Sequence, residues 1–228
     1  MAGLKIALVG AESTGKSVLA QDLAPRLTAD TGLTVAVVPE FLRHWCEQAG
    51  RTPRPEEQAA IAAEQARQIR AAAARHELVL CDTTPLMVAI YSQQLFDDAS
   101  LLPAALEFQR GCALTLLTTP DLPWVADGMR DGAHVQAPVD AALRRALLGA
   151  GLSWSIVSGR GPARLDAALN AITPLLLRRR SGAQALPGHG LFTRLQARQD
   201  ALPDQAWFCQ DCDVPECEHA MLQRARRR

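Results

Sequence analysis

The chain has 228 residues, of which 48% are hydrophobic and 21% are charged, and its 24 basic side chains balance 24 acidic ones. This is an ordinary globular composition, and the length suits one domain with a short appendage. A net charge of zero gives no general attraction to nucleic acid, and no apolar run approaches the ~20 residues that span a bilayer. We therefore expect a cytoplasmic protein without a membrane partner, and we do not expect nucleic acid as a partner.

Short apolar runs alternate with helical patterns along roughly the first 180 residues. The runs that we predict as strands are 4–10, 33–40, 77–84, 113–120 and 153–159, and the patterns that we predict as helices are 16–27, 54–76, 85–96, 101–112, 137–152 and 161–179. Strands that are apolar throughout and alternate with helices indicate a parallel sheet covered on both faces. The predicted fold is α/β, with three layers and a mostly parallel five-stranded sheet flanked by helices.

The first run and the helix after it enclose the sequence GAESTGKS, residues 10–17, which matches the pattern G-x4-G-K-[ST]. Only Lys5 and Lys16 are lysines, so the chain places one of its two ammonium groups in this motif. Such a loop between a strand and a helix cradles phosphates with its backbone N–H groups, and its lysine reaches the β- and γ-phosphates. We predict a P-loop NTPase fold that binds ATP and Mg²⁺. The nucleotide contacts are assigned to Gly10, Glu12, Ser13, Thr14, Gly15, Lys16, Ser17 and Val18, with the Ser17 hydroxyl on Mg²⁺.

Two carboxylates end predicted strands. Asp82 follows the apolar run LVLC, at the sheet edge where open α/β sheets bind ligands, and we expect it to serve Mg²⁺ or the reacting hydroxyl. Glu40 ends the second run and could accept a proton from a substrate hydroxyl. Simpler interpretations stay open, because Asp82 could cap the helix that begins near Pro85 and Glu40 could be a solvated glutamate at a helix start.

The segment PWVADGMRDG, residues 123–132, helps to decide which class of P-loop protein the chain is. The NKxD motif with which GTPases read their base is absent, and no second long domain is present for an ATPase motor, so a small-molecule kinase is favoured. Trp124 can stack on a flat ring, and Arg130 on a glycine-flanked loop can close on the transferring phosphoryl group. A core tryptophan and a surface ion pair are the alternative interpretations of these two residues.

The motifs GAESTGKS, PWVADGMR and Asp82-Thr83 resemble the ribosylnicotinamide kinase domain of NadR-type proteins, over about residues 4–177. The resemblance implies transfer of a phosphoryl group from ATP to the 5′-hydroxyl of nicotinamide riboside, giving nicotinamide mononucleotide. It places Trp124 against the nicotinamide ring and Asp127 and Arg130 on the ribose and phosphate side. Glu40 and Arg43 match a family Glu-x-x-Arg stretch, and Thr84, also assigned to the substrate site, stands where the family often has a second acid.

The predicted mechanism is in-line transfer. Lys16, Mg²⁺ and Arg130 neutralise charge on the phosphoryl group, while Glu40 or Asp82 deprotonates the hydroxyl. The sequence does not decide between these two carboxylates. Two alternative functions remain: a kinase for another nucleoside, and a P-loop ATPase switch whose zinc-bound tail binds a partner. Gly159, Arg160 and Arg164 follow the fifth strand, where adenine binding and a plain helix-start loop are equally compatible with the sequence. The oligomeric state is not predicted.

We assign residues 1–180 to the kinase domain and 181–228 to a linker with a Cys/His-rich segment. Cys209, Cys212, Cys217 and His219 lie within eleven residues in the pattern C-x2-C-x4-C-x-H. Four such ligands suit tetrahedral Zn²⁺, which could stabilise a segment that lacks a core of its own. Unligated thiols in a loose tail and a redox or iron–sulfur role are the alternatives. Cys46, Cys81 and Cys112 lie in apolar contexts and are expected to be inert.

Overall fold

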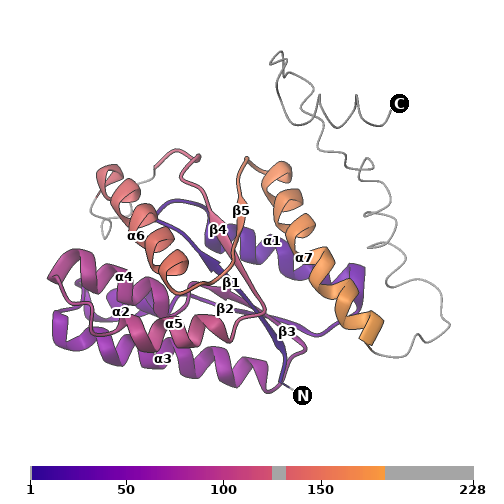
Figure 1. The fold of residues 1–228 in the computed structure, drawn as a ribbon, viewed down its shortest axis with the longest axis horizontal. Coiled ribbons are helices and arrows are strands. Elements are labelled where there is room, and N and C mark those ends of the chain that lie inside the picture. Colours follow the sequence, from indigo (N-terminus) through magenta and orange to yellow (C-terminus); the bar gives the residue numbers. More distant parts are fainter. Residues whose placement is uncertain (1, 125–131, 183–228) are drawn as a thin grey trace, which may run out of the picture.

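One parallel sheet organises the residues that the computed structural model describes, which are 2–124 and 132–182. Its strand order is β2-β3-β1-β4-β5, and all four neighbouring pairs run parallel (Figure 1). The strands are β1 (Leu4–Val9), β2 (Val35–Val38), β3 (Leu78–Asp82), β4 (Leu114–Thr118) and β5 (Ser155–Val157). Each lies inside a predicted run, so the predicted five-stranded parallel sheet is confirmed.

Helices cover both faces of the sheet, which gives the three predicted layers. They are α1 (Lys16–Thr31), α2 (Phe41–Ala49), α3 (Pro55–Ala73), α4 (Pro85–Phe96), α5 (Leu102–Arg110), α6 (Gln136–Gly149) and α7 (Pro162–Gly182), with a short 3₁₀ turn at Ala133–Val135. Helices α1 and α7 lie on one face, while α3, α4, α5 and α6 lie on the other and α2 packs on α3 (Figure 1). Among the described helices, none has the length and apolar character that would let it cross a membrane.

The central strand β1 is buried on both faces. Ile6 and Leu8 pack with leucines of α1 and α7, whereas Ala7 and Val9 pack with α4 and α6. Successive side chains of a strand point to opposite faces, so a strand covered twice must be apolar at every position. This requirement explains why the run before the glycine-rich loop contains no polar residue after Lys5.

The strand order places the functional motifs together. Strand β1 lies between β3 and β4, and Leu8 is in register with Asp82 on one side and Leu116 on the other. The chain crosses from β1 to β2 on one side and later returns to β4 on the other, so β1 marks the switch point of the sheet. Ligands of open α/β sheets bind beyond the carboxyl ends of the strands at such a point.

Helices α2 and α1 differ most from the sequence-based expectation. Helix α2 was not predicted: Pro39 ends β2, and a nine-residue helix begins one residue after Glu40. Helix α1 continues through Pro25 to Thr31 although the predicted helix ended at residue 27. Leu19, Leu23 and Leu27 form a buried stripe in the core, and Arg26 bonds to Asp30 at 2.6 Å across the last turn, so tertiary packing holds the helix despite its proline.

Candidate active site

The glycine-rich loop between β1 and α1 needs its glycines, because a Cβ at Gly10 would collide with a neighbouring strand. Gly10 has φ 151°, and a Cβ there would lie 2.3 Å from Oγ1 of Thr118. Ser13 and Gly15 have φ values of 55° and 73°, so the loop passes twice through the left-handed region before α1 begins. Alternation into that region turns successive backbone N–H groups to one side and builds an anion-binding concavity.

Side chains from distant segments brace this loop from outside. The Thr14 hydroxyl donates to the Ala11 carbonyl at 2.8 Å and lies 2.7 Å from the Thr118 hydroxyl of β4. Gln136, at the start of α6, donates to the Glu12 carbonyl at 2.7 Å. These bonds hold the loop in its curved form before any ligand binds, which lowers the entropic cost of gripping a phosphate chain.

Lys16 lies inside the curve of the loop. It is 9% exposed, and its Nζ donates to the carbonyls of Gly10 at 3.0 Å and Ala11 at 2.8 Å. Burial lowers the pKa of this ammonium, and the nearby charges of Glu40 and Asp82 oppose that effect. The ammonium of Lys16 is therefore close enough to interact with Glu40 and Asp82, the two carboxylates that the sequence predicted for the site.

Asp82 ends β3 and is 4% exposed. Its Oδ1 is buried and has no hydrogen-bond partner among the described residues. A carboxyl oxygen without a partner is costly in a protein interior, and a cation or a hydrogen-bond donor would satisfy it. The N-cap of α4 is Thr84 and not Asp82, so the simpler interpretation of Asp82 as a helix cap does not hold.

The residue after Asp82 is strained. Thr83 has φ 67°, which is an unusual conformation for a β-branched residue, and its N–H donates to the Leu8 carbonyl at 3.1 Å. Strain of this kind costs about 1–3 kcal/mol and persists where the surroundings enforce it. Here the bond to β1 fixes the turn in which Asp82 leaves the sheet.

Glu40 does begin a helix, as its simpler interpretation supposed, but its side chain is mostly buried and not fully solvated. It is the N-cap residue of α2 without a side-chain capping bond, and its side chain is 16% exposed. Its Oε2 lies 3.8 Å from the guanidinium of Arg43 in the first turn of α2, and among nearby charges it has the largest effect on Lys16. The structure thus brings Lys16, Glu40, Arg43 and Asp82 to one place.

Other predicted substrate residues are placed differently. Thr84 is fully buried, and its hydroxyl donates to Oε1 of Gln109, which in turn donates to Thr115. Its side chain therefore belongs to a buried hydrogen-bond chain and not to the site. Trp124 is half-buried, with an indole Nε1 that has no hydrogen-bond partner among the described residues. Asp127 and Arg130 lie outside the described residues.

Arg164 has a role that sequence reasoning missed. It is 4% exposed, and its two terminal nitrogens donate to the carbonyls of Thr14 at 2.6 Å, Gly159 at 2.7 Å and Thr119 at 3.0 Å, and to Asp121 at 2.7 Å. Partial burial tends to raise the pKa of Asp121, but bonds from Arg164 and from the N–H of Gly159 hold it below its ordinary value. A single guanidinium thereby ties the P-loop to the segments that follow β4 and β5.

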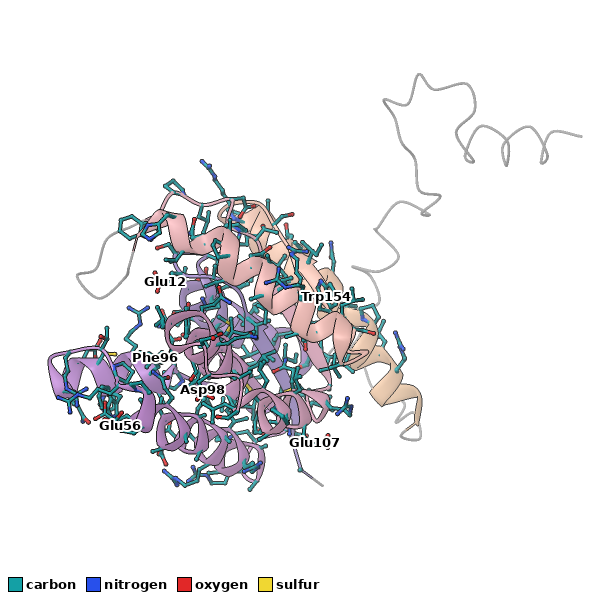
Figure 2. All side chains as sticks on the ribbon, turned by 60° about the vertical axis from the view of Figure 1, so that its left-hand side comes forward. Glu12, Glu56, Phe96, Asp98, Glu107 and Trp154 are labelled. Atoms are coloured by element: carbon teal, nitrogen blue, oxygen red, sulfur yellow. The ribbon has the colours of Figure 1, made fainter. Side chains whose placement is uncertain are left out.

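The site lies at the carboxyl end of the sheet. Glu12 of the P-loop follows the carboxyl end of β1, whereas Trp154, which lies to the right of Glu12 in Figure 2, precedes the amino end of β5. A cavity of about 220 Å³ beside Trp154 is lined by residues that begin β4 and β5. It is therefore separate from the phosphate-binding loop.

The predicted zinc ligands Cys209, Cys212, Cys217 and His219 lie outside the described residues, and within residues 2–124 and 132–182 no group of His, Cys, Asp and Glu could hold a metal by itself. Zinc binding stays a prediction. Metal analysis of the purified full chain and of its Cys209→Ser, Cys212→Ser double variant tests it.

Burial raises the pKa of the Cys46, Cys81 and Cys112 thiols. Thiols held in the protonated state are poor nucleophiles, as expected of inert cysteines.

A phosphate-binding loop of this sequence, at the carboxyl end of the central strand of a parallel sheet, defines the P-loop class of nucleotide-binding proteins. Residues 5–164 match the family described as AAA domain, and the chain belongs to that family. No curated protein matches the sequence.

Solved structures share the fold. The NadR protein in complex with NAD and AMP-PNP superposes with a TM-score of 0.60 at 17% identity, over 82% of this chain and 52% of that chain. The NadR protein in complex with NR gives 0.57 at 18% identity, over 74% and 51% of the two chains. Thymidylate kinase from Ehrlichia chaffeensis gives 0.53 at 13% identity, over 77% and 100%. The chain spans about half the length of the NadR proteins, and the predicted resemblance to them is confirmed at the level of the fold.

Proposed function

We propose that this chain is an ATP-dependent kinase that phosphorylates the 5′-hydroxyl of nicotinamide riboside. The observation that carries the proposal is the arrangement around Lys16: a buried ammonium in a P-loop, flanked by Glu40 and by Asp82 with its unpartnered buried oxygen. A site that only bound nucleotide would need the lysine and one metal-binding acid. A second carboxylate beside the lysine suits a reaction in which a hydroxyl loses its proton.

The two carboxylates differ in a way that separates their roles. Asp82 fits Mg²⁺ because its buried Oδ1 has no hydrogen-bond partner among the described residues, and Ser17, at the start of α1, carries the hydroxyl that the P-loop motif provides for the same cation. Bound with ATP, Mg²⁺ would neutralise charge on the phosphates. Glu40 is more exposed than Asp82 and lies at a helix start, so we assign it to orient and deprotonate the acceptor hydroxyl.

Lys16 would then exchange its bonds to the Gly10 and Ala11 carbonyls for bonds to the phosphates. Because the loop is already braced, this exchange needs only a movement of the side chain. Charge that develops on the transferring group would be met by a fixed ammonium in a site of low exposure, which is where electrostatic stabilisation is strongest.

The choice of nicotinamide riboside rests on residues that the sequence shares with NadR-type kinases. The Glu-x-x-Arg stretch supplies Glu40 and Arg43, Trp124 is proposed to flank the nicotinamide ring, and Asp127 and Arg130 are proposed for the ribose and phosphate side. That a NadR protein of the same fold was solved with NR supports the choice. The extent of the kinase domain, residues 1–180, is proposed on the same grounds.

A kinase for another nucleoside is the second candidate, and the position of Thr84 favours it. The NadR family often has an acid there that could bind ribose hydroxyls, whereas this chain has a threonine whose hydroxyl is used by Gln109. We leave Thr84 out of the proposed substrate site. A site without that acid would discriminate less between ribose-bearing and other nucleosides.

A substrate panel with ATP and Mg²⁺ tests both candidates. The purified chain should phosphorylate nicotinamide riboside with a kcat/KM well above those for thymidine, adenosine and cytidine. A preference for one of the other nucleosides supports the second candidate. ATP hydrolysis that no nucleoside changes contradicts both, and it would indicate a P-loop ATPase switch.

A further inference from the structure

A buried glutamine grips the backbone on both sides of Glu40. Gln65 of α3 is 1% exposed, and its Oε1 accepts the N–H of Phe41 at 2.6 Å while its Nε2 donates to the carbonyl of Pro39 at 3.2 Å. Pro39 and Phe41 are the two neighbours of Glu40 in the chain. One planar amide therefore holds both peptide groups that flank the proposed base.

These two backbone groups lie outside the regular bonding of the neighbouring elements. The last register pair of β2 is Val38 with Cys81, so the Pro39 carbonyl lies beyond the paired part of the strand. Phe41 is the first residue of α2, and N–H groups in the first turn of a helix have no partner within the helix. A side chain that supplies both an acceptor and a donor is needed, and a neutral amide does so with two separate atoms, an oxygen that accepts and a nitrogen that donates.

The position of Gln65 is unusual for a polar residue. It lies on the buried stripe of α3 between Ile61 and Ile69, four residues from each, where burial of an apolar side chain would contribute more to stability. Because both amide atoms find backbone partners, the polar group is satisfied and its burial is tolerated. What Gln65 adds is a fixed backbone conformation between β2 and α2, because it bonds to Pro39 and Phe41.

We propose that Gln65 is a positioning residue that fixes the Glu40 carboxylate relative to Lys16 and the acceptor hydroxyl. This inference rests on the proposed function, in which Glu40 takes the proton. Glu40 has φ −67° and ψ 110°, and rotation of either flanking peptide would swing its side chain away from the P-loop. A displacement of about 1 Å at a reacting group can cost about 100-fold in rate.

Gln65→Met tests the proposal, because methionine has a similar length and lacks both hydrogen-bonding atoms. With ATP and the best nucleoside of the panel, we expect kcat to fall about 10- to 100-fold while the KM for ATP stays unchanged. Gln68→Met is the matched control on the same helix, since Gln68 bonds to Glu64 at 2.9 Å and not to the β2–α2 turn. It should leave kcat within about twofold of wild type.

A double-mutant cycle with Glu40→Gln separates positioning from general stability. If Gln65 acts through Glu40, Gln65→Met should change kcat less than about twofold once Glu40 is replaced. Equal losses of kcat in both backgrounds overturn the proposal, and so does wild-type kcat in Gln65→Met. If the wild-type chain transfers no phosphoryl group to any nucleoside, both the proposed function and the positioning role of Gln65 are wrong. If the wild-type chain transfers a phosphoryl group but the effects of Gln65→Met and Glu40→Gln on kcat are independent, only the positioning role is wrong.

Gln65→Glu keeps the proposal testable if the methionine variant does not fold. Ionised, this side chain accepts the Phe41 N–H but repels the Pro39 carbonyl. Protonated, it both accepts and donates as the amide does. The ratio of its kcat to that of wild type should therefore rise as the pH falls, and a ratio that does not change with pH contradicts the proposal.

Discussion

The guanidinium of Arg164 donates to Oδ1 of Asp121 at 2.7 Å and to the carbonyl of Thr14 in the P-loop at 2.6 Å. Arg164 and Thr14 come from opposite ends of the domain's sequence, because Arg164 lies in the first turn of α7 and Thr14 precedes α1. The same side chain also holds the carbonyls after β4 and at Gly159. The shape of the phosphate site thus depends on a residue 150 positions away in the chain.

Replacing Arg164 should destabilise the fold strongly. Arg164→Met removes the ion-pair partner of Asp121, whose side chain is 35% exposed, and removes the donor to three carbonyls. Each buried acceptor that is left unpaired costs about 1–3 kcal/mol. Arg160→Met is the control, because Arg160 is exposed and, among the described residues, donates only to the Asp121 carbonyl, at 3.1 Å and 3.3 Å. Its cost should stay below about 1 kcal/mol. Urea unfolding measures both, and equal losses would contradict a bracing role for Arg164.

Lys16→Ala should lower kcat at least about 100- to 1,000-fold, which is the cost of removing one preorganised donor from an active site. Lys16→Arg should restore little of this loss, since a guanidinium is larger and planar and the loop encloses a compact ammonium. Lys5→Ala is the matched control: Lys5 lies near the start of β1, with its Nζ 5.0 Å from the centre of the Phe108 ring. Steady-state kinetics with circular dichroism distinguishes lost catalysis from lost folding, and a fully active Lys16→Ala variant would contradict the site.

The P-loop, Asp82 and the sheet could be predicted because their signals are local. A glycine-rich motif is contiguous, and an acid at the end of an apolar strand needs no knowledge of partners. Glu40 could be predicted for the same reason. Helix α2 was missed because it has nine residues and follows a proline and a strand directly, so its pattern is short.

Arg164, Gln136 and Gln65 could not be assigned from the sequence because their partners are far along the chain, at separations of 150, 124 and 24 residues. Gln65 did carry a signal, since a glutamine four residues from each of two buried isoleucines breaks an apolar stripe. Thr84 shows the opposite error. It stands where the NadR-type family often has a second acid, which suggested a substrate contact, but its buried hydroxyl donates to Gln109.

Asp82→Asn should raise the Mg²⁺ concentration needed for half-maximal activity and lower kcat by about 100-fold or more. Asparagine has the same shape but no charge, so the fold should be kept while attraction for the cation is lost. Asp22→Asn, on the exposed face of α1, is the control and should titrate with Mg²⁺ like wild type. Excess EDTA should abolish transfer by all three proteins. An unchanged Mg²⁺ dependence in Asp82→Asn would show that the unpartnered oxygen does not serve the metal.

Trp124→Ala should raise the KM for the nucleoside about 10- to 100-fold, because stacking of a base on an aromatic ring is worth about 1–3 kcal/mol. The KM for ATP should not change, and Trp124→Phe should keep most of the affinity since it keeps a ring. The alternative is that Trp124 is a core residue. In that case Trp124→Ala would lower the free energy of unfolding by about 3–5 kcal/mol and leave the KM for the nucleoside as it was.

The start of α3 should contribute a pH-dependent part of the stability. Glu57 accepts two bonds from the Arg51 guanidinium, at 2.7 Å and 2.8 Å, and one from the Arg54 N–H at 2.7 Å. The bonds from Arg51, and then that from Arg54, lower the pKa of Glu57 to about 2. Because the pKa is lower in the folded state, the ionised form stabilises the fold. This contribution is complete above the unfolded pKa of about 4.3 and is lost as the pH falls toward 2.

Glu57→Gln keeps an acceptor for the Arg54 N–H and removes the charge. Its deficit in free energy of unfolding relative to wild type should therefore be largest near pH 7 and shrink steadily from about pH 5 to pH 3. High salt should reduce the deficit at pH 7, since the pair is partly exposed. Glu56→Gln, at the neighbouring exposed position (Figure 2), is the control and should show little deficit at any pH. Urea unfolding across this range measures the difference, and a deficit of constant size from pH 7 to pH 3 would mean that the charge of Glu57 does not stabilise the helix start.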